Sequence, residues 1–143
     1  MSKVTSSIHI AAPPQAVWDV VMDPERLADW VTIHRGLGKH GRTHMEQTLH
    51  IRGVNFHVHW DLVESDEPRL AVWEGRGPAR SHATTEYRLK PDGNGGTRFD
   101  YTNEFKAPLG PLGSVASRAV MGGVPEREAK KSLAKLKALL EKG

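Results

Sequence analysis

Five polar side chains occupy positions that β-strands would turn toward an apolar face. From about residue 43 to residue 105 the sequence alternates with a period of two, which is typical of strands that bury one face. The polar residues in phase with the aliphatic ones are Gln47, Thr85, Tyr87, Tyr101 and Asn103. Because buried amide and hydroxyl groups need hydrogen-bond partners, we expect them to line a cavity that could bind and orient a small molecule. The alternative is that the tyrosine hydroxyls reach the rim and both amides lie near strand ends.

A second group of reactive side chains is rich in histidine and falls on the opposite face of the same strands. Its members are His44, Glu46, His50, His57, His59 and Asp61. Imidazoles and carboxylates can bind zinc or nickel. An exposed sheet face, however, lacks the dry pocket and the supporting hydrogen bonds that a catalytic metal needs. We therefore expect no metal site and no cofactor, and a polar surface that gains positive charge below about pH 6.5.

Nucleophilic catalysis has little support in the sequence. The chain has no cysteine, which excludes disulfides and thiolate metal sites, and it has no Gly-x-Ser-x-Gly motif. Gly75 and Gly77 form a Gly-x-Gly pair, but no predicted helix follows them, so we interpret them as the end of a strand rather than a dinucleotide site. No residue is assigned a catalytic role on these grounds.

The alternation predicts strands at about 43–52, 54–64, 69–76, 80–90 and 97–106, after a loose glycine-rich stretch at 36–41. Between the first two of these strands, Arg52-Gly53 is a two-residue turn signal that sets the hairpin register. The pairs that this register places on one face are Ile51 with Val54, Leu49 with Phe56, Gln47 with Val58 and Met45 with Trp60. A slip of one residue would put the apolar side chains on opposite faces, so the agreement supports the register.

Two short helices are predicted ahead of these strands. A first strand runs through Ile10 and leads into Pro13-Pro14, which fits a first helical turn where no N–H is needed. Asp23-Pro24 then restarts the helical pattern, because Asp can accept hydrogen bonds from free N–H groups at a helix start. Leu27 and Trp30 form the apolar side of that second helix.

A long helix is predicted to close the chain. Ser114 is a candidate N-cap, and Val115, Ala119 and Val120 are expected to face the sheet. Residues 122–125 interrupt the pattern and predict either a kink or a gate that admits a ligand. An apolar stripe then resumes at Ala129, Leu133, Leu136 and Leu140.

Length and charge restrict the class of protein. A chain of 143 residues favours one domain over residues 1–143, and the absence of a membrane-spanning apolar run or a secretory signal pattern favours a cytoplasmic protein. Residues 125–143 hold six Lys or Arg and three Glu, which accounts for the net charge of +3. The sequence therefore gives little support to nucleic-acid binding. A basic stripe of Arg127, Lys131 and Lys135 could still contact an acidic protein or a membrane surface.

Several segments, in this order, resemble the START/Bet v 1-like (SRPBCC) superfamily and its bacterial polyketide cyclase/dehydrase-like branch. They are Ala-Pro-Pro-Gln-Ala-Val-Trp (12–18), Asp-Pro-Glu-Arg-Leu-Ala-Asp-Trp (23–30), Val-Trp-Glu-Gly-Arg-Gly-Pro (72–78), Gly-Gly-Thr-Arg-Phe-Asp-Tyr (95–101) and Pro-Leu-Gly-Pro-Leu-Gly (108–113). The resemblance spans nearly the whole chain. It implies an α+β helix-grip fold, in which a curved antiparallel sheet of about six strands, in β-α-α-β5-α order, wraps around a long C-terminal helix.

In the resembled fold a ligand lies between sheet and helix. The residues that strand phase and the resemblance together place on that cavity are Trp30, Met45, Gln47, Leu49, Phe56, Val58, Trp60, Val72, Glu74, Thr85, Tyr87, Phe99, Tyr101, Asn103, Val115 and Ala119. Glu74 shares the strand phase of Leu70 and Val72, and a buried Glu would have a raised pKa and could act as an acid. Cyclases of the resembled branch orient the enolate of a polyketide with such side chains, and Arg76 is a further candidate for that role.

Three functions follow from the resemblance, because this scaffold hosts different activities. The first is binding of a hydrophobic or amphipathic small molecule, such as a polyketide, lipid, isoprenoid or aromatic compound. The second is a polyketide aromatase/cyclase or dehydratase that uses the same cavity. The third is binding of a partner through the basic last helix. Since the residues reveal no dedicated acid–base pair, the first is favoured.

Overall fold

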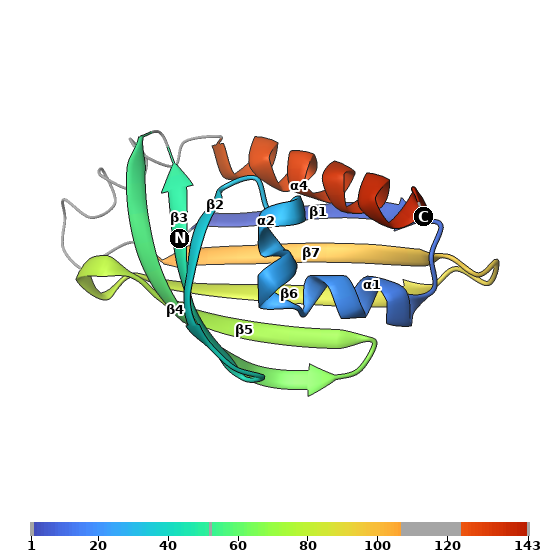
Figure 1. Cartoon of the computed structure of the whole chain (residues 1–143), viewed down its shortest axis with the longest axis horizontal. Coiled ribbons are helices and arrows are strands. Elements are labelled where there is room, and N and C mark those ends of the chain that lie inside the picture. The colour runs from blue at the N-terminus through green and yellow to red at the C-terminus, as the bar shows by residue number, and fades with distance from the viewer. Residues whose placement is uncertain (1, 52, 107–123, 143) are drawn as a thin grey trace.

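Seven antiparallel strands and a long C-terminal helix organise residues 2–51, 53–106 and 124–142, which this computed structural model describes (Figure 1). The elements are, in chain order, β1 (Ser2–Ile10), α1 (Pro14–Val21), the short 3-10 helix η1 (Pro24–Arg26), α2 (Leu27–Trp30), β2 (His34–His40), β3 (His44–Ile51), β4 (Val54–Asp66), β5 (Leu70–Arg76), the 3-10 helix η2 (Pro78–Arg80), β6 (His82–Pro91), β7 (Thr97–Lys106) and α4 (Val124–Glu141). The predicted N-cap Ser114, the inward-facing Val115, Ala119 and Val120, and the glycines of the predicted kink or gate lie outside the described residues.

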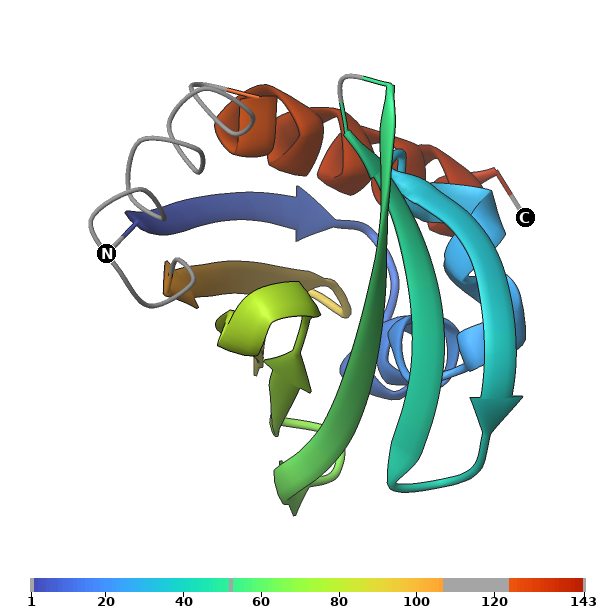
Figure 2. The same ribbon diagram turned by 90° about the vertical axis from the view of Figure 1, so that its left-hand side faces the viewer.

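The strands form one sheet in the order β1-β7-β6-β5-β4-β3-β2, in which all neighbours are antiparallel. The sheet curves so that β2, β3 and β4 lie across the interior from β1 and β7, and α4 runs beside β1 along the open side (Figure 2). This arrangement confirms the predicted α+β fold with a long C-terminal helix packed against a curved sheet. No helix in the described part of the chain combines the length and hydropathy that a membrane span requires.

The strand β2 was not predicted, and it makes the sheet one strand larger than expected. It occupies the stretch whose glycines indicated a loose connection, and it pairs only with β3, at the edge of the sheet. Its pairing is irregular between His34 and Gly36 and again between Leu37 and His40. Because Gly36 and Gly38 contribute no side chain, the two-residue period that reveals a strand is absent there.

The hairpin of β3 and β4 has the predicted register. Ile51 pairs with Val54, and the ladder continues to the pair of Met45 and Trp60. Gly53 in the connecting turn has a φ of +81°, a left-handed conformation that glycine adopts without steric cost. The sequence therefore determined this register through turn chemistry and through the single apolar face that it preserves.

The strand phase predicted for β5 is wrong. Trp73 pairs with Leu62 on β4 and with Thr85 on β6, so it shares the concave face of the sheet with them. Ala71, Trp73 and Gly75 are consequently buried, whereas Glu74 is exposed. The expectation that Val72 and Glu74 point into the cavity is corrected by this pairing.

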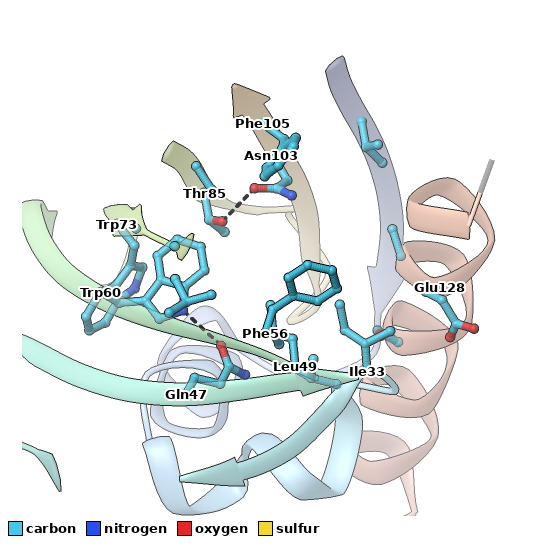
Figure 3. A pocket seen from close by; sticks show the side chains of 18 of the residues that line it. Ile33, Gln47, Leu49, Phe56, Trp60, Trp73, Thr85, Asn103, Phe105 and Glu128 are labelled. Atoms are coloured by element: carbon cyan, nitrogen blue, oxygen red, sulfur yellow. Dashed lines mark hydrogen bonds between the residues drawn. The ribbon is translucent and has the colours of Figure 1, made fainter. Parts of the chain in front are cut away.

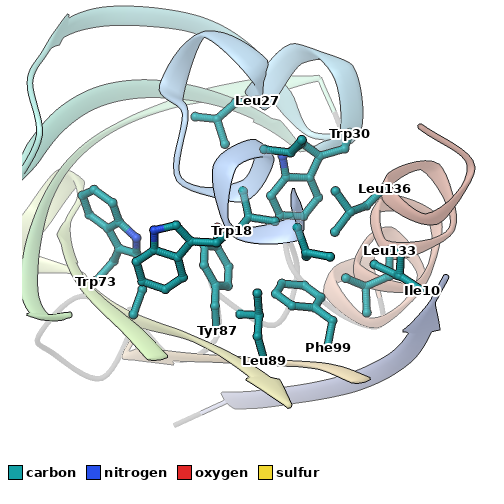
Figure 4. Close-up of a cluster of buried hydrophobic side chains, with 14 of the residues drawn as sticks. Ile10, Trp18, Leu27, Trp30, Trp73, Tyr87, Leu89, Phe99, Leu133 and Leu136 are labelled. Carbon is teal, nitrogen blue, oxygen red and sulfur yellow. The ribbon is translucent and has the colours of Figure 1, made fainter. Parts of the chain in front are cut away.

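Aromatic side chains from α2, β6 and β7 form the centre of the core. The ring centroids of Tyr87 and Phe99 are 5.5 Å apart. The ring centroid of Trp30 lies 6.1 Å from that of Tyr87 and 6.4 Å from that of Phe99 (Figure 4). Leu133 and Leu136 of α4 are 2% and 0% exposed and pack on this cluster, which confirms the predicted apolar stripe. Burial of this size stabilises each such leucine by about 1.5–3 kcal/mol relative to exposure.

Capping and hydrogen bonds hold the helices in register with the sheet. The side chain of Asp23 accepts a hydrogen bond of 3.0 Å from the backbone N–H of Glu25, as its predicted capping role requires. At the far end of α4, Glu141 accepts a 2.7 Å bond from the backbone N–H of Ala11, and Lys137 donates a 2.9 Å bond to the carbonyl of His9. These contacts attach α4 to the end of β1.

Candidate functional site

A cavity of about 250 Å³ lies between the concave face of the sheet and α4 (Figure 3). Strands β3 to β7 provide most of its wall, and the remainder comes from β1, from α2 and the segment that follows it, from η2 and from α4. Most lining residues are apolar or aromatic, with a small number of amide, hydroxyl and indole groups among them. This composition is typical of sites for small organic molecules, in which a few polar atoms orient an apolar ligand.

Most residues predicted for the cavity from strand phase and the resemblance lie together on this wall. They are Trp30, Met45, Gln47, Leu49, Phe56, Val58, Trp60, Thr85, Tyr87, Tyr101 and Asn103. Phe99 instead lies fully buried in the aromatic core, 0% exposed. Val72 and Glu74 belong to the outer side of β5, and Val115 and Ala119 are outside the described residues.

Among the parts of the wall that the sequence analysis missed are Trp73, Ile33 and Glu128. Trp73 lines the cavity and is buried together with Ala71 and Gly75. The predicted phase places the alternate residues of this strand on the inner face. Ile33 also lines the cavity, from the segment just before the unpredicted strand β2. Glu128 lies next to the predicted apolar stripe of α4, so a wider helical face would have included it.

Gln47 is the centre of a hydrogen-bonded chain across three strands. The indole Nε1–H of Trp60 donates to Oε1 of Gln47 at 2.9 Å, and Nε2 of Gln47 lies 2.9 Å from Nδ1 of His34. Because the indole can only donate, the amide oxygen faces Trp60 and the amide nitrogen donates to His34. His34 is therefore neutral with its proton on Nε2, and burial lowers the pKa of its imidazole.

Trp73, Thr85 and Asn103 form a second polar row on the cavity wall, which begins beside Trp60 (Figure 3). They are directly opposite one another on β5, β6 and β7. The hydroxyl of Thr85 donates to Oδ1 of Asn103 at 3.0 Å, and Figure 3 shows the amide nitrogen of Asn103 directed away from Thr85. The indole of Trp73 is 4% exposed, and its N–H has no acceptor among the described residues.

Tyr87 and Tyr101 lie side by side, with ring centroids 6.1 Å apart. Burial raises the pKa of Tyr101 to about 12, and burial together with the neighbouring Tyr101 raises the pKa of Tyr87. Both phenols are therefore protonated at neutral pH, and neither hydroxyl has a hydrogen-bond partner among the described residues. They are available to donate to a ligand in the cavity.

One carboxylate, that of Glu128, belongs to the wall that the described residues form. It accepts a hydrogen bond from the hydroxyl of Thr32, whose backbone N–H donates to the hydroxyl of Ser132 at 3.1 Å. This cluster attaches α4 to the segment between α2 and β2. No Lys or Arg contributes to the wall within the described part of the chain.

The candidates Glu74 and Arg76 lie outside the cavity. Both line a polar groove on the outer face of the sheet, and Arg76 forms an ion pair of 3.4 Å with Asp61. The acid expected at Glu74 is therefore not part of the internal site, because its side chain is exposed to water. Any reaction that used Glu74 and Arg76 would have to occur on the outer surface of the sheet.

The histidines of the outer face make local hydrogen bonds. Nδ1 of His57 lies 3.0 Å from the hydroxyl of Thr48, and Nδ1 of His50 lies 2.7 Å from Oδ1 of Asn55. His44 and His59 are exposed on the same side. Within residues 2–51, 53–106 and 124–142, no three His, Asp or Glu side chains are arranged to hold a metal ion.

Comparisons with known proteins agree with this geometry. A family model described as polyketide cyclase/dehydrase and lipid transport matches residues 1–141. An uncharacterized protein of Mycobacterium tuberculosis is 29% identical over 132 residues, which cover 87% of this chain and 92% of that protein. A second protein of that organism, described as a toxin, is 24% identical over 133 residues, which cover 88% of this chain and 92% of that protein.

Solved structures with low sequence identity share the fold. The Zhui aromatase/cyclase from Streptomyces sp. R1128 superposes with a TM-score of 0.77 at 18% identity, covering 98% of this chain and 93% of that one. A START superfamily protein from Mycobacterium smegmatis gives a TM-score of 0.72 at 19% identity, covering 98% and 97%. The chain therefore belongs to the polyketide cyclase/dehydrase and lipid transport family.

Proposed function

We propose that this protein binds a hydrophobic or amphipathic small molecule in the cavity between the sheet and α4. The observation that carries the proposal is the wall itself, which is mostly apolar and aromatic and has a few polar groups directed by defined hydrogen bonds. A volume of about 250 Å³ is slightly below the range of about 300–1,000 Å³ that is common for ligand sites. A compact ligand, such as an aromatic or a small polyketide, fits this volume better than a long-chain lipid.

The family supports the proposal at a coarser level, because its description covers both polyketide cyclases and lipid transport. Both activities need an apolar cavity that excludes water from the ligand. The fold alone does not distinguish cyclisation from transport, so the distinction depends on the chemistry of the wall. Binding without turnover is our first choice, since the only carboxylate of the described wall, Glu128, is engaged by Thr32.

Turnover as a cyclase or dehydratase is the second candidate. The protonated hydroxyls of Tyr87 and Tyr101 favour it, because such donors can stabilise an enolate as it forms. Glu128 could accept a proton if a ligand displaced its bond to Thr32. A poly-β-ketone incubated with the protein would then cyclise faster than in buffer, and Glu128→Gln would abolish the acceleration.

Partner binding through α4 is the third candidate, and exposed positive charge supports it. Arg127, Lys131 and Lys135 are exposed on the helix. Sedimentation with ribosomes or with vesicles containing anionic lipid would test it, using a variant in which these three residues are changed to Glu. Loss of sedimentation in that variant would favour the third candidate over the first.

Native mass spectrometry of protein purified from its own host tests the first candidate. We expect an apolar compound at a ratio near one to one, recovered by organic extraction, or saturable binding of prodan, a neutral fluorescent naphthyl ketone. Ala83→Leu should weaken the binding of prodan because Ala83 lines the cavity. Ala138→Leu, on the exposed face of α4, is the matched control. A protein that is empty and does not bind prodan would overturn the proposal.

A further inference from the structure

The amide of Gln47 has a single orientation in the cavity wall. Its oxygen faces the indole N–H of Trp60, a group that cannot accept a hydrogen bond, and its nitrogen donates to Nδ1 of His34. Rotating the amide by half a turn would set its N–H against the indole N–H and leave both donors unpaired. Such an unpaired buried donor costs about 1–3 kcal/mol. The second N–H of the amide has no acceptor among the described residues, although Gln47 lines the cavity.

A second group that can only donate lies on β5, the strand next to that of Trp60 (Figure 3). The indole of Trp73 is 4% exposed, lines the cavity and has no acceptor for its N–H among the described residues. Next to it, the hydroxyl of Thr85 donates a hydrogen bond to Oδ1 of Asn103. The amide nitrogen of Asn103 can therefore donate to a ligand. Figure 3 shows Gln47 and Trp60 on one side of this space and Thr85 and Asn103 on the other.

The charge of the wall narrows the ligand further. The described residues place no Lys or Arg on it, so an anionic ligand would meet no permanent positive charge there. Glu128, the carboxylate of the wall, already accepts a bond from Thr32 and lies on α4, away from the polar groups of β3 and β5. If a ligand turned N–H donors toward Gln47 and Trp73, those donors would face the N–H groups of the wall and would find no acceptor there.

Resting on the proposed function, we infer that the cavity selects neutral molecules whose polar atoms are hydrogen-bond acceptors, such as carbonyl or ether oxygens. The groups that make this selection are Gln47, fixed by Trp60 and His34, and Trp73. Isosteric molecules that present N–H donors at the same positions are rejected. The oxygen of such a ligand would accept from the free N–H of Gln47 or from the indole of Trp73, and its hydrocarbon part would fill the apolar wall.

Three bicyclic probes of nearly equal shape test the inference by calorimetry or equilibrium dialysis. They are naphthoquinone, dimethylnaphthalene and diaminonaphthalene, each substituted at the same two ring positions. We expect the quinone to bind at least about tenfold more tightly than the diamine, since mismatched donors remain unpaired in a buried site. The dimethyl compound measures the apolar contribution alone. The chain has no cysteine, so the quinone cannot react with a thiol.

Two variants assign the preference to its residues. Trp60→Phe frees the amide of Gln47 to rotate, and Trp73→Phe removes one donor, so each should reduce the preference for the quinone over the diamine several-fold. Trp18→Phe is the matched control, because Trp18 is 5% exposed in the core and does not line the cavity. It should keep the preference.

The outcomes separate the two levels of the argument. If none of the three probes binds, the proposed cavity function fails. If all three bind with equal affinity, or the diamine binds most tightly, the cavity is functional and the selection for acceptors is overturned. If Trp60→Phe and Trp73→Phe remain folded and keep the full preference, the assignment to these donors is overturned.

Discussion

The indole ring of Trp60 on β4 lies over Gly75, its partner on β5, so closely that a Cβ at position 75 would meet ring atoms at 2.7 and 2.8 Å. The contact determines where the ring stands in the cavity wall. The hydrogen bond from Trp60 to Gln47 depends in turn on that position.

Gly75→Ala should therefore destabilise the protein and weaken binding of prodan. Overpacking against a buried ring costs about 1–3 kcal/mol, because the ring must shift toward the cavity and away from Gln47. Urea unfolding and fluorescence titration measure the two effects. Gly36→Ala is the control, since a Cβ there would have its nearest atom at 3.9 Å. A Gly75→Ala protein as stable as the wild type, with unchanged affinity, would contradict the role given to this contact.

Stability should fall as the solution is acidified through the range in which His34 titrates. Burial lowers the pKa of His34 in the folded protein below its ordinary value of 6.5. The unfolded chain then binds more protons than the folded one, so the free energy of unfolding rises with pH across that window. The protein accordingly loses stability as pH falls below about 6.5. Urea unfolding between pH 5 and pH 8 measures this slope.

His34→Gln keeps a hydrogen-bonding side chain but does not titrate, so its pH slope should be shallower than that of the wild type. His57→Gln, at an exposed position on the outer face, is the matched control, against which the change in slope of His34→Gln is compared. Equal slopes for the wild type and His34→Gln would exclude His34 as the source.

The two tyrosines of the chain should not ionise in the folded protein near pH 10. Burial raises the pKa of Tyr101 to about 12 and also raises the pKa of Tyr87. The folded protein then holds protons that the unfolded chain releases, so stability falls as pH rises above about 10. Because the chain has only these two tyrosines, ultraviolet absorbance reports them directly. A phenolate signal with a midpoint near 10, before any loss of circular dichroism, would contradict their burial.

The hydroxyl of Thr32 should contribute to the attachment of α4. It donates to the carboxylate of Glu128, and hydrogen bonds to charged groups contribute about 1.5–3 kcal/mol. Thr32→Val should lower the free energy of unfolding by about 1–3 kcal/mol and speed amide exchange in α4. Thr32→Ser retains the hydroxyl and is the control. The attachment would be refuted if the Val and Ser variants exchanged amide protons at the same rate.

Local patterns in the sequence were sufficient for most of the architecture. The register of the β3–β4 hairpin follows from one turn and one apolar face, since any slip exposes the apolar side chains. The apolar stripe through Leu133 and Leu136 follows from helical spacing, and it is buried as expected. The cavity wall on β3, β4, β6 and β7 was accessible to the same reasoning, because the pairing of β3 with β4 and of β6 with β7 is unbroken.

Tertiary structure alone decided the features that depend on a partner strand. The pairing of Trp73 with Leu62 on β4 and with Thr85 on β6 determines the phase of β5, so that Trp73 and not Glu74 faces the cavity. A period of two within β5 is compatible with either phase, and only the pairing to its neighbouring strands selects one. Likewise, the orientation of the Gln47 amide is determined by Trp60 and His34, which come from two other strands. The sequence thus determined which residues form most of the sheet and the closing helix, whereas strand pairing and the cross-strand hydrogen bonds determined which groups the cavity presents.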